Sequence, residues 1–460
     1  MTTYLLVDFG STYTKLTAVD QTKREIIGTS KAYTTVETNV LNGYKTAYNQ
    51  LTSKHQISHI DQTLACSSAK GGFKMVAIGL SPTLTAEAAK RAALGAGTRI
   101  LNVYSYGLKS SDIKEIESLQ PDVILLSGGT NGGNEKNILN DAKLLTELSI
   151  NIPIVIAGNE EIYPEIKALF KQHCINFYLT ENVMPQINHL NALPTRNILR
   201  QIFIENIIKA KGMGDIQANL TAHIIPTPTA VLNAAELLAQ GTATHKGYGN
   251  TLIVDVGGAT TDIHSIGNGK SSKKNVQLSG LEEPFCKRTV EGDLGMRYSA
   301  LSLLESVTPD AFNSYTKIDT QRISQMCHYR SQHPEYIADT KEDKELDNTI
   351  AKLAIKHAVK RHAGYYVKEQ TPSRTIYHQY GKDLTTFNTI IGTGGIIVHN
   401  QHPEKILTAA LSKTEETILT PENSELYVDK DYILSAIGLL STVDKELAFD
   451  IAIKHLKRVK

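Results

Sequence analysis

The sequence predicts an α/β chain built on a duplicated domain, with a separate doubly wound α/β domain inserted in the first copy. Two observations favour the duplication and the insertion. Residues 5–15 read LLVDFGSTYTK and residues 252–262 read LIVDVGGATTD, which is almost the same stretch 247 positions later. Between residues 63 and 180, short apolar runs alternate with helical patterns, as in a parallel sheet. The length of 460 residues is sufficient for two to four domains.

Each copy of the repeat predicts a strand, a tight turn and a second strand. The first strands are expected at Tyr4–Val7 and Thr251–Val254, where aliphatic and β-branched residues dominate. The second strands are expected at Leu16–Val19 and Ile263–Ile266. A glycine stands in each turn, where it allows backbone conformations that other residues avoid.

The residues of the two turns are those that a phosphate site requires. Backbone amides around a glycine can converge on an anion, which predicts phosphate contacts from the turn residues of both copies. These are Gly10, Ser11 and Thr12 in the first copy, and Gly257, Gly258 and Ala259 in the second. Asp8 and Asp255 end the first strands, where a carboxylate can hold Mg²⁺ through water or orient an attacking water. We expect two such hairpins to bind the phosphates of one nucleotide from opposite sides.

The inserted region carries two further motifs at the carboxyl ends of expected strands. Its strands are expected at MVAIGL, RILNVYS, DVILLSG, IPIVIAGN and INFYLT. SGGTNGGN (127–134) and AGNEEIYPEI (157–166) follow two of them, at the edge where open parallel sheets bind ligands. Either motif is equally explained as a strand-to-helix turn with only a structural role.

Composition excludes several other classes of protein. The chain has 48 basic and 47 acidic side chains, which argues against bulk electrostatic binding to nucleic acid or to an anionic membrane. No stretch approaches 18 apolar residues, and no leader sequence is expected at the start. The four cysteines lack metal-binding spacing, so we expect reduced thiols, no zinc site and a cytoplasmic location.

Together with three more segments, the repeat resembles the motifs of the actin, sugar-kinase and DnaK-type ATPase superfamily. IPTPTAVLNAAELL (225–238) is similar to the first connecting helix, NTIIGTGGIIVH (388–399) to the adenosine motif, and DYILSAIGLLS (431–441) to the closing helix. In the closing helix, Ala436 and Gly438 are expected to permit close packing of two helices. The resemblance implies a two-lobed actin-like ATPase fold made of duplicated ribonuclease-H-like domains. It also implies ATP and Mg²⁺ as ligands.

On this resemblance we expect five segments along the chain. Residues 1–62 begin lobe I, 63–180 form the inserted domain, and 181–248 complete lobe I with the first connecting helix. Residues 249–430 form lobe II with a helical subdomain at about 300–385, and 431–460 return to lobe I.

The resemblance also implies roles for particular residues. Asp8, Asp255, Lys15 and Asp262 are the catalytic candidates, and Asp8 and Asp255 the metal candidates. The remaining nucleotide-binding candidates are Thr14, Thr260, Thr261, Glu291, Asp293, Gly392, Gly394 and Gly395, in addition to the turn residues named above; Arg297 is a weaker one. One position departs from the DnaK-type pattern, because Thr227 stands where the connecting helix has a glutamate. A threonine cannot act as a general base, so we expect slow hydrolysis, and we expect Thr227→Glu to raise it.

Six further stretches narrow the resemblance to one family, the MutL-type accessory proteins of adenosylcobalamin-dependent glutamate mutase. They are DFGSTYTKLTAVD, TTVETNV, SSAKGGFKMVAIGL, LTAEAAKRAALGAG, SGGTNGGN and ENVMPQINHLNALPTRN. The family resemblance implies a reactivating chaperone that exchanges damaged cobalamin on a mutase, whose subunits are the expected partners. Two alternatives stay open: a small-molecule kinase or hydrolase of the superfamily, and a non-hydrolysing assembly factor.

Overall fold

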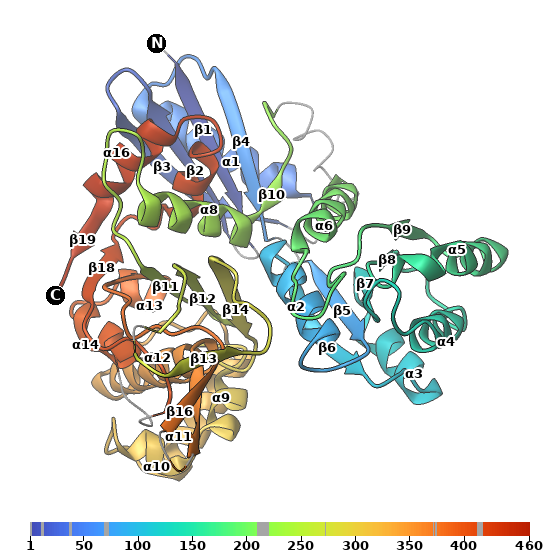
Figure 1. The fold of residues 1–460 in the computed structure, drawn as a ribbon. Helices are drawn as coiled ribbons and strands as arrows, with labels where there is room; N and C mark the ends of the chain where they lie inside the picture. Colours follow the sequence, from blue (N-terminus) through green and yellow to red (C-terminus); the bar gives the residue numbers. More distant parts are fainter. Residues whose placement is uncertain are drawn as a thin grey trace. The chain divides into compact units, whose positions relative to one another are not determined.

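The computed structural model describes residues 2–10, 13–35, 39–68, 73–208, 220–271, 273–370, 372, 375–411 and 417–460 (Figure 1). The chain divides into two compact units. The first comprises Met1–Asn233, Gly280–Glu282 and Ser435–Leu447, and the second comprises Ala234–Ser279, Glu283–Leu434 and Ala448–Lys460.

The first unit contains a five-stranded sheet in the order β10-β4-β1-β2-β3. β1 pairs with β2, and β2 with β3, in antiparallel fashion, whereas β4 is parallel to β1 and β10 is parallel to β4. Helix α1 packs against β2 and β3, and begins at Asn39, whose side chain accepts a hydrogen bond from the Leu41 amide. The elements are β1 (Thr3–Phe9), β2 (Tyr13–Asp20), β3 (Glu25–Tyr33), α1 (Val40–His55), β4 (Gln62–Ser67) and β10 (Ile225–Pro226).

The main sheet of the second unit repeats this topology, in the order β14-β12-β11-β17-β18-β19. β11, β12 and β14 are antiparallel, β17 is parallel to β11, and β18 is parallel to β17. The elements are β11 (Thr251–Val256), β12 (Thr261–Ile266), β14 (Cys286–Glu291), β17 (Thr389–Thr393), β18 (Glu425–Asp429) and the added edge strand β19 (Leu456–Arg458). The same strand order and directions in both units confirm the predicted duplication.

A second sheet of the first unit is wholly parallel, in the order β6-β5-β7-β8-β9. Side chains of α3, α4 and α5 form a core on one face, and side chains of α2 and α6 belong to the core on the other. This is the predicted doubly wound domain. Its elements are β5 (Lys74–Gly79), α2 (Thr85–Gly95), β6 (Arg99–Ser105), α3 (Ser110–Leu119), β7 (Val123–Leu126), α4 (Lys136–Leu145), β8 (Ile154–Ile156), η2 (Glu160–Ile162), α5 (Tyr163–Gln172), β9 (Phe177–Leu179) and α6 (Ala192–Ile208).

The predicted limits of the insertion, 63 and 180, differ from the extent of this packing. β4 pairs with β1, so the first sheet continues to Ser67. Helix α6 packs on α2, so the helical cover of the parallel sheet continues to Ile208. Both differences arise because contacts between distant segments, rather than local pattern, decide which core a helix or strand joins.

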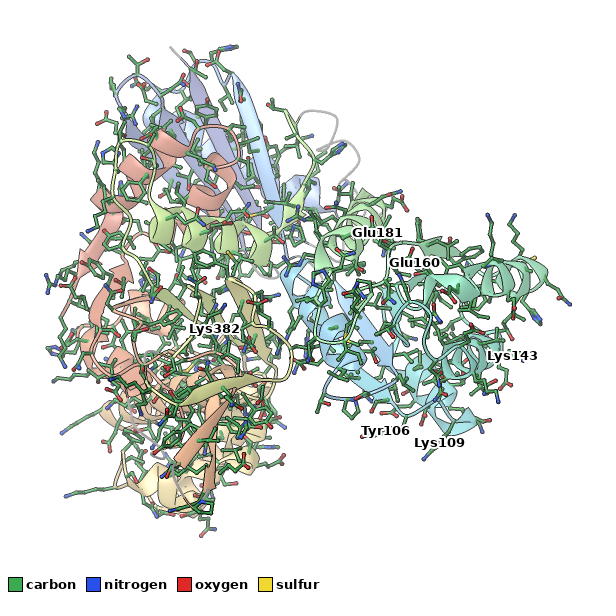
Figure 2. All side chains as sticks on the ribbon, viewed as in Figure 1. Tyr106, Lys109, Lys143, Glu160, Glu181 and Lys382 are labelled. Atoms are coloured by element: carbon green, nitrogen blue, oxygen red, sulfur yellow. The ribbon has the colours of Figure 1, made fainter. Side chains whose placement is uncertain are left out.

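Helices and a small sheet complete the second unit. Strands β13, β16 and β15 form a three-stranded sheet, and α12 packs against β11, β12 and β14. Lys382, labelled in Figure 2, is fully buried, and its ammonium donates to the carbonyls of Ser265, Pro284 and Phe285. The remaining elements are β13 (Val276–Ser279), α9 (Ala300–Ser306), α10 (Pro309–Asn313), α11 (Thr320–Gln332), α12 (Lys341–His362), β15 (Tyr365–Gln370), β16 (Thr375–Tyr380), α13 (Gly395–Val398), α14 (Pro403–Leu407), η3 (Thr408–Leu411) and α16 (Lys445–His455).

Three helices cross from one unit to the other along the chain. The division falls within α8 (Thr227–Gln240), after Asn233, within α15 (Leu434–Leu440), after Leu434, and within α16, after Leu447. The first two of these helices pack on each other. In the first unit these helices touch at Gly438, where an added Cβ would lie 1.6 Å from the Ala230 carbonyl oxygen. This confirms the prediction that Gly438 permits close packing of two helices. None of the helices in the described ranges is long and apolar enough to cross a membrane.

Candidate nucleotide-binding site

The two predicted turns close in the same way. The Gly10 amide donates to the Tyr13 carbonyl at 3.1 Å, and the Gly257 amide donates to the Thr260 carbonyl at 2.9 Å. A Cβ added at Gly10 would lie 2.7 Å from the Tyr13 oxygen, and one at Gly257 would lie 3.0 Å from the Thr260 oxygen. The first turn therefore requires glycine at this position, and the second leaves little room for a Cβ. Ser11 and Thr12 lie outside the described residues.

The catalytic candidates stand opposite one another in each hairpin. Asp8 is in register with Lys15 across β1 and β2, and Lys15 with Lys31 across β2 and β3. In the second hairpin Asp255 is in register with Asp262, whose carboxylate pairs with Arg288 at 2.8 Å. The first hairpin thus adds positive charge beside its aspartate, whereas the second adds a carboxylate.

Asp8 is held by three side chains from different elements. Its Oδ1 accepts hydrogen bonds from Thr227 at the start of α8 (2.8 Å) and from the thiol of Cys66 on β4 (3.5 Å). Its Oδ2 accepts one from Ser435 on α15 (3.1 Å). Burial, and then the Asp8 charge, raise the pKa of Cys66 well above its ordinary value, which keeps the thiol protonated as a donor.

Sequence reasoning placed Thr227 beside the site but missed Cys66 and Ser435. Cys66 is the residue of β4 in register with Asp8, so the order of the strands is the missing information. Ser435 is 427 positions away from Asp8, and no local pattern marks it.

Hydroxyl groups in the two hairpins fix the turns. Thr34 donates to the Gly10 carbonyl at 2.8 Å, and Thr14 donates to the Thr34 hydroxyl at 3.2 Å. In the second unit the Thr261 hydroxyl donates to the Leu294 carbonyl at 2.5 Å. Thr14 and Thr261, predicted to bind nucleotide, are thus buried and make contacts within the protein.

The segment after β14 holds the second turn by its carbonyl groups. The amides of Met296 and Arg297 donate to the carbonyls of Gly257 (3.0 Å) and Gly258 (2.7 Å). The Ser299 hydroxyl donates to the Ala259 carbonyl at 2.6 Å. Three successive carbonyls of the turn are therefore fixed by one short segment.

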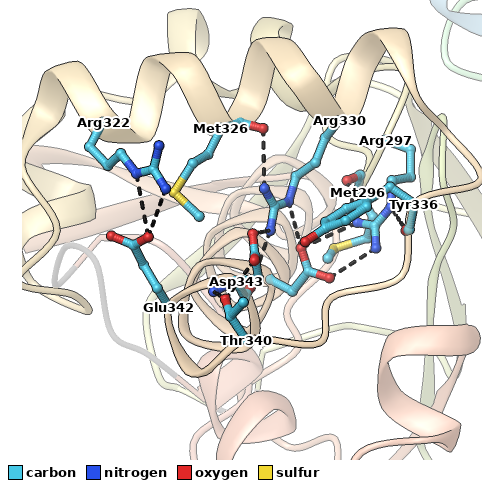
Figure 3. A network of polar contacts seen from close by, with 10 residues as sticks. Met296, Arg297, Arg322, Met326, Arg330, Tyr336, Thr340, Glu342 and Asp343 are labelled. Carbon is cyan, nitrogen blue, oxygen red and sulfur yellow. Dashed lines mark hydrogen bonds and ion pairs between the residues drawn. The ribbon is translucent and has the colours of Figure 1, made fainter.

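The charged side chains of this segment contact the helices of the second unit. Arg297 binds the Asp347 carboxylate through both terminal nitrogens, at 2.9 and 3.3 Å, and donates through Nε to the Tyr336 carbonyl (Figure 3). Arg361 pairs with Glu291 at 2.9 Å and with Asp293 at 2.6 Å, and it lowers the pKa of Asp293. The roles of these side chains as nucleotide ligands stay predictions, since the contacts observed are internal ones.

The turn after β17 lies against the end of β11, next to the second hairpin. Thr393 is in register with Asp255. Gly394 has a φ of +95°, and an added Cβ would lie 2.3 Å from the Val256 carbonyl oxygen. An added Cβ at Gly392 would meet Leu407, whereas one at Gly395 would have nothing within 4 Å. The predicted adenosine motif is therefore adjacent to the predicted phosphate turn.

The two motifs of the inserted domain bind each other. Asn131 of SGGTNGGN donates to Glu160 of AGNEEIYPEI at 3.0 Å. Asn182 donates to the Gly129 carbonyl at 3.0 Å and to Asn131 at 2.8 Å. These bonds support the structural explanation of both motifs, because the amides and the carboxylate fix three neighbouring loops.

A polar cavity of about 590 Å³ lies at the other edge of the second-unit sheet. It is bordered by Thr389 and Glu425, the first residues of β17 and β18, whereas Gly257 follows the last residue of β11. It is therefore separate from the predicted phosphate turn.

The residues present fit a metal bound through water rather than directly. Across the described parts of the chain, no three His, Cys, Asp or Glu side chains are grouped as a metal site. Asp8 offers one carboxylate at the first turn and Asp255 one at the second. Mg²⁺ commonly keeps several waters and takes only one or two carboxylates together with phosphate oxygens.

Comparison with known proteins gives a family match over nearly the whole chain. A family model described as MutL protein matches residues 4–456. Protein MutL of Clostridium tetanomorphum is 47% identical over 462 residues, covering 100% of both chains. Among solved structures, a xylulose kinase from Lactobacillus acidophilus has a TM-score of 0.35 at 9% identity, covering 100% of this chain and 93% of that one. A glycerol dehydratase reactivase has a TM-score of 0.34 at 9% identity, covering 96% and 99%.

Proposed function

The chain belongs to the MutL protein family, the glutamate mutase accessory family, and from this premise we propose that it is an ATP-binding reactivating chaperone. Its partner is an adenosylcobalamin-dependent mutase, either glutamate mutase or a related aminomutase. Its action is to promote the exchange of damaged cobalamin for intact cofactor. The nucleotide supplies the change of state that drives release.

The observation that carries the nucleotide-binding proposal is the identical closure of two turns in two topologically equivalent hairpins. In both hairpins a glycine stands two residues after an aspartate, and the amide of this glycine donates to the carbonyl of the residue three positions further along the chain. Glycine-containing turns of this kind can direct successive amides toward an anion. We assign the phosphates of one nucleotide to both turns, and the adenosine to the turn at Gly394 and Gly395.

In this assignment Mg²⁺ would be held through water by Asp8 and Asp255. The ion supplies charge neutralisation for the phosphates. Lys15 adds a positive charge at the first hairpin, and Asp262 orients water at the second.

Hydrolysis is expected to be slow. The first turn of α8 contains no acidic residue, and the Thr227 hydroxyl donates to Asp8. No carboxylate in that helical turn can therefore accept a proton from water. Slow turnover suits a timed conformational switch.

The absence of an acidic residue from the first turn of α8 also favours a second candidate function. This candidate is a nucleotide-binding assembly factor that does not hydrolyse ATP. The two functions differ in whether ADP accumulates. They also differ in whether ATPγS, a slowly hydrolysed analogue, replaces ATP.

Reconstitution tests the proposal directly. Glutamate mutase inactivated by turnover is incubated with this protein, adenosylcobalamin, Mg²⁺ and ATP, and recovered mutase activity and released cobalamin are measured. We expect recovery with ATP and none without nucleotide. Recovery with ATPγS at the ATP rate would select the non-hydrolysing candidate, and absence of both recovery and mutase binding would contradict the proposal.

A further inference from the structure

The surroundings of Asp8 carry one inference beyond nucleotide binding itself. Asp8 is only 8% exposed, and its three donors come from β4, α8 and α15. We call Cys66, Thr227 and Ser435 the Asp8 clasp. Both helices that donate a hydroxyl are among those along which the chain passes between its two units.

The clasp limits what the carboxylate can do. An ionised carboxylate has about four lone-pair sites, two on each oxygen. Thr227 and Cys66 take both sites on Oδ1, and Ser435 takes one on Oδ2. With respect to the residues that the structure describes, Oδ2 therefore keeps one acceptor site, enough for a single metal-bound water.

Backbone contacts fix the positions of the three donors relative to Asp8. Cys66 is in register with Asp8 within the sheet. The helices bearing Thr227 and Ser435 touch at Ala230 and Gly438, three residues further along each helix. A shift of either helix would move a hydroxyl relative to the carboxylate.

We propose that Thr227 and Ser435 are positioning residues which set the Mg²⁺ response of the nucleotide site by fixing the Asp8 carboxylate between α8 and α15. The inference rests on the proposed nucleotide function. It assigns Thr227 a role of its own, as a donor to Asp8, rather than that of a substitute for a missing glutamate. It also assigns a function to Ser435, which the sequence did not mark.

The contact between Thr227 and Asp8 leads us to propose a different effect for Thr227→Glu. A glutamate at this position would put a second carboxylate against Asp8, where a donor stands now. Two adjacent carboxylates repel each other unless a cation lies between them. The substitution is therefore expected to weaken binding of Mg²⁺·ATP instead of raising hydrolysis.

Titration calorimetry of ATP with and without Mg²⁺ tests the clasp. Thr227→Val and Ser435→Ala should each reduce the gain in affinity that Mg²⁺ provides by roughly tenfold or more, about the value of one hydrogen bond to a charged group. Binding of ATP in EDTA should stay unchanged. Thr227→Ser and Ser435→Thr keep the hydroxyl and should restore the Mg²⁺ gain.

Each helix offers a matched control. Thr229 of α8 is buried and donates to the Ala96 carbonyl, and Ser441, which follows α15, is buried and donates to the Gly438 carbonyl. Thr229→Val and Ser441→Ala remove a similar hydroxyl away from Asp8 and should keep the full Mg²⁺ gain. The clasp would be overturned if Thr227→Val and Ser435→Ala kept the full Mg²⁺ gain in ATP affinity while Asp8→Asn reduced it. The nucleotide proposal would stand in that case.

A second measurement applies even if the wild-type protein binds no nucleotide. The effects of Thr227→Val and Asp8→Asn on the melting temperature should be non-additive, because both act on the same hydrogen bond: the first removes its donor and the second replaces its charged acceptor by a neutral amide. Those of Thr229→Val and Asp8→Asn should add. Additive effects in both pairs of variants would overturn the clasp. Non-additive effects of Thr227→Val and Asp8→Asn, in a protein that binds no nucleotide, would support the contact but contradict the proposed function.

Discussion

At the scale of single residues, Asp8 and Asp255 hold equivalent places in the two hairpins but have different neighbours. Asp8 has Lys15 opposite it, and Asp255 has Asp262. If each carboxylate contributes to metal and water positioning, its loss acts on the transition state. Asp8→Ala and Asp255→Ala should each lower Mg²⁺-dependent ATP turnover by about tenfold or more.

A coupled assay of phosphate release measures this turnover. Asp20→Asn is the control, because Asp20 is a buried carboxylate at the far end of β2 that accepts from the amides of Thr22 and Lys23. Wild-type turnover in both alanine variants would contradict the catalytic assignment.

Buried histidines make the stability of the second unit depend on pH. His264 is fully buried on β12, and burial, together with Arg288, lowers its pKa to about 3. Its folded pKa lies below its ordinary value of 6.5, so protonation favours the unfolded state. The contribution to stability is complete above pH 6.5 and is lost progressively as the pH falls toward 3.

Urea midpoints at pH 7 and pH 5 test this dependence. The urea midpoint of the wild-type protein should be lower at pH 5 than at pH 7, and His264→Leu should make this difference smaller. His402, which is exposed, provides the control variant His402→Leu. An equal fall in wild type and His264→Leu would show that His264 is not responsible.

At the scale of elements, α11 and α12 are joined by ion pairs that differ in burial, among them Arg330–Asp347, Arg330–Asp343 and Arg322–Glu342. Asp347 accepts from Arg330 at 2.8 Å and from Arg297 at 2.9 Å, and its side chain is 5% exposed. Glu342 pairs with Arg322 at 3.0 Å, with 44% and 49% of the two side chains exposed (Figure 3). The two pairs lie on the same helices but differ in burial.

Removing the buried carboxylate should cost far more than removing the exposed one. Asp347→Asn removes the carboxylate that pairs with Arg297 and one of the two that pair with the buried Arg330, which keeps Asp343. It should destabilise the protein by about 3 kcal/mol. Glu342→Gln should change stability by less than about 1 kcal/mol. Urea unfolding followed by circular dichroism provides both values, and equal effects would contradict the distinction.

The packing of α8 on α15 can be tested by one methyl group. At Gly438 a Cβ would lie 1.6 Å from a backbone oxygen, so Gly438→Ala must separate the helices. Overpacking of this kind costs about 1–3 kcal/mol. Gly395→Ala, where the Cβ meets nothing within 4 Å, is the control for stability. A melting temperature unchanged in Gly438→Ala would show that the helices can move apart freely.

Sequence alone predicted those parts of the fold that leave a local pattern. The hairpins at Asp8 and Asp255, the five parallel strands and the glycine contact of α15 all have such patterns, and all are observed. The clasp donors Cys66 and Ser435 were not predicted, because strand order and helix crossing bring them to Asp8. Arg361 and Asp347 were also missed as the partners of Asp293 and Arg297, since ion pairs between segments far apart in the chain have no sequence signal.

At the scale of the whole molecule, the parallel domain is the candidate for binding the mutase. The phosphate turns, the adenosine turn and the connecting helices all lie outside residues 73–208. One face of its sheet has a core of its own with α3, α4 and α5, while the other shares a core with the first sheet. A deletion should therefore begin after β4 and remove α6 as well as the parallel strands, unlike a cut at 63–180.

Removing residues 73–208 with a short linker should leave ATP affinity within a few fold and abolish mutase binding. Because coupling between sites is reciprocal, the intact protein should bind the mutase differently with ATP and with ADP, and the mutase should change nucleotide affinity by the same factor. Pull-down and calorimetry measure both. Tyr106→Asp changes a side chain that is 77% exposed at the carboxyl end of β6. This variant tests the role of the parallel domain in mutase binding in a chain of full length. Loss of ATP binding with retention of the mutase, in a folded deletion variant, would show that the two roles are assigned to the wrong domains.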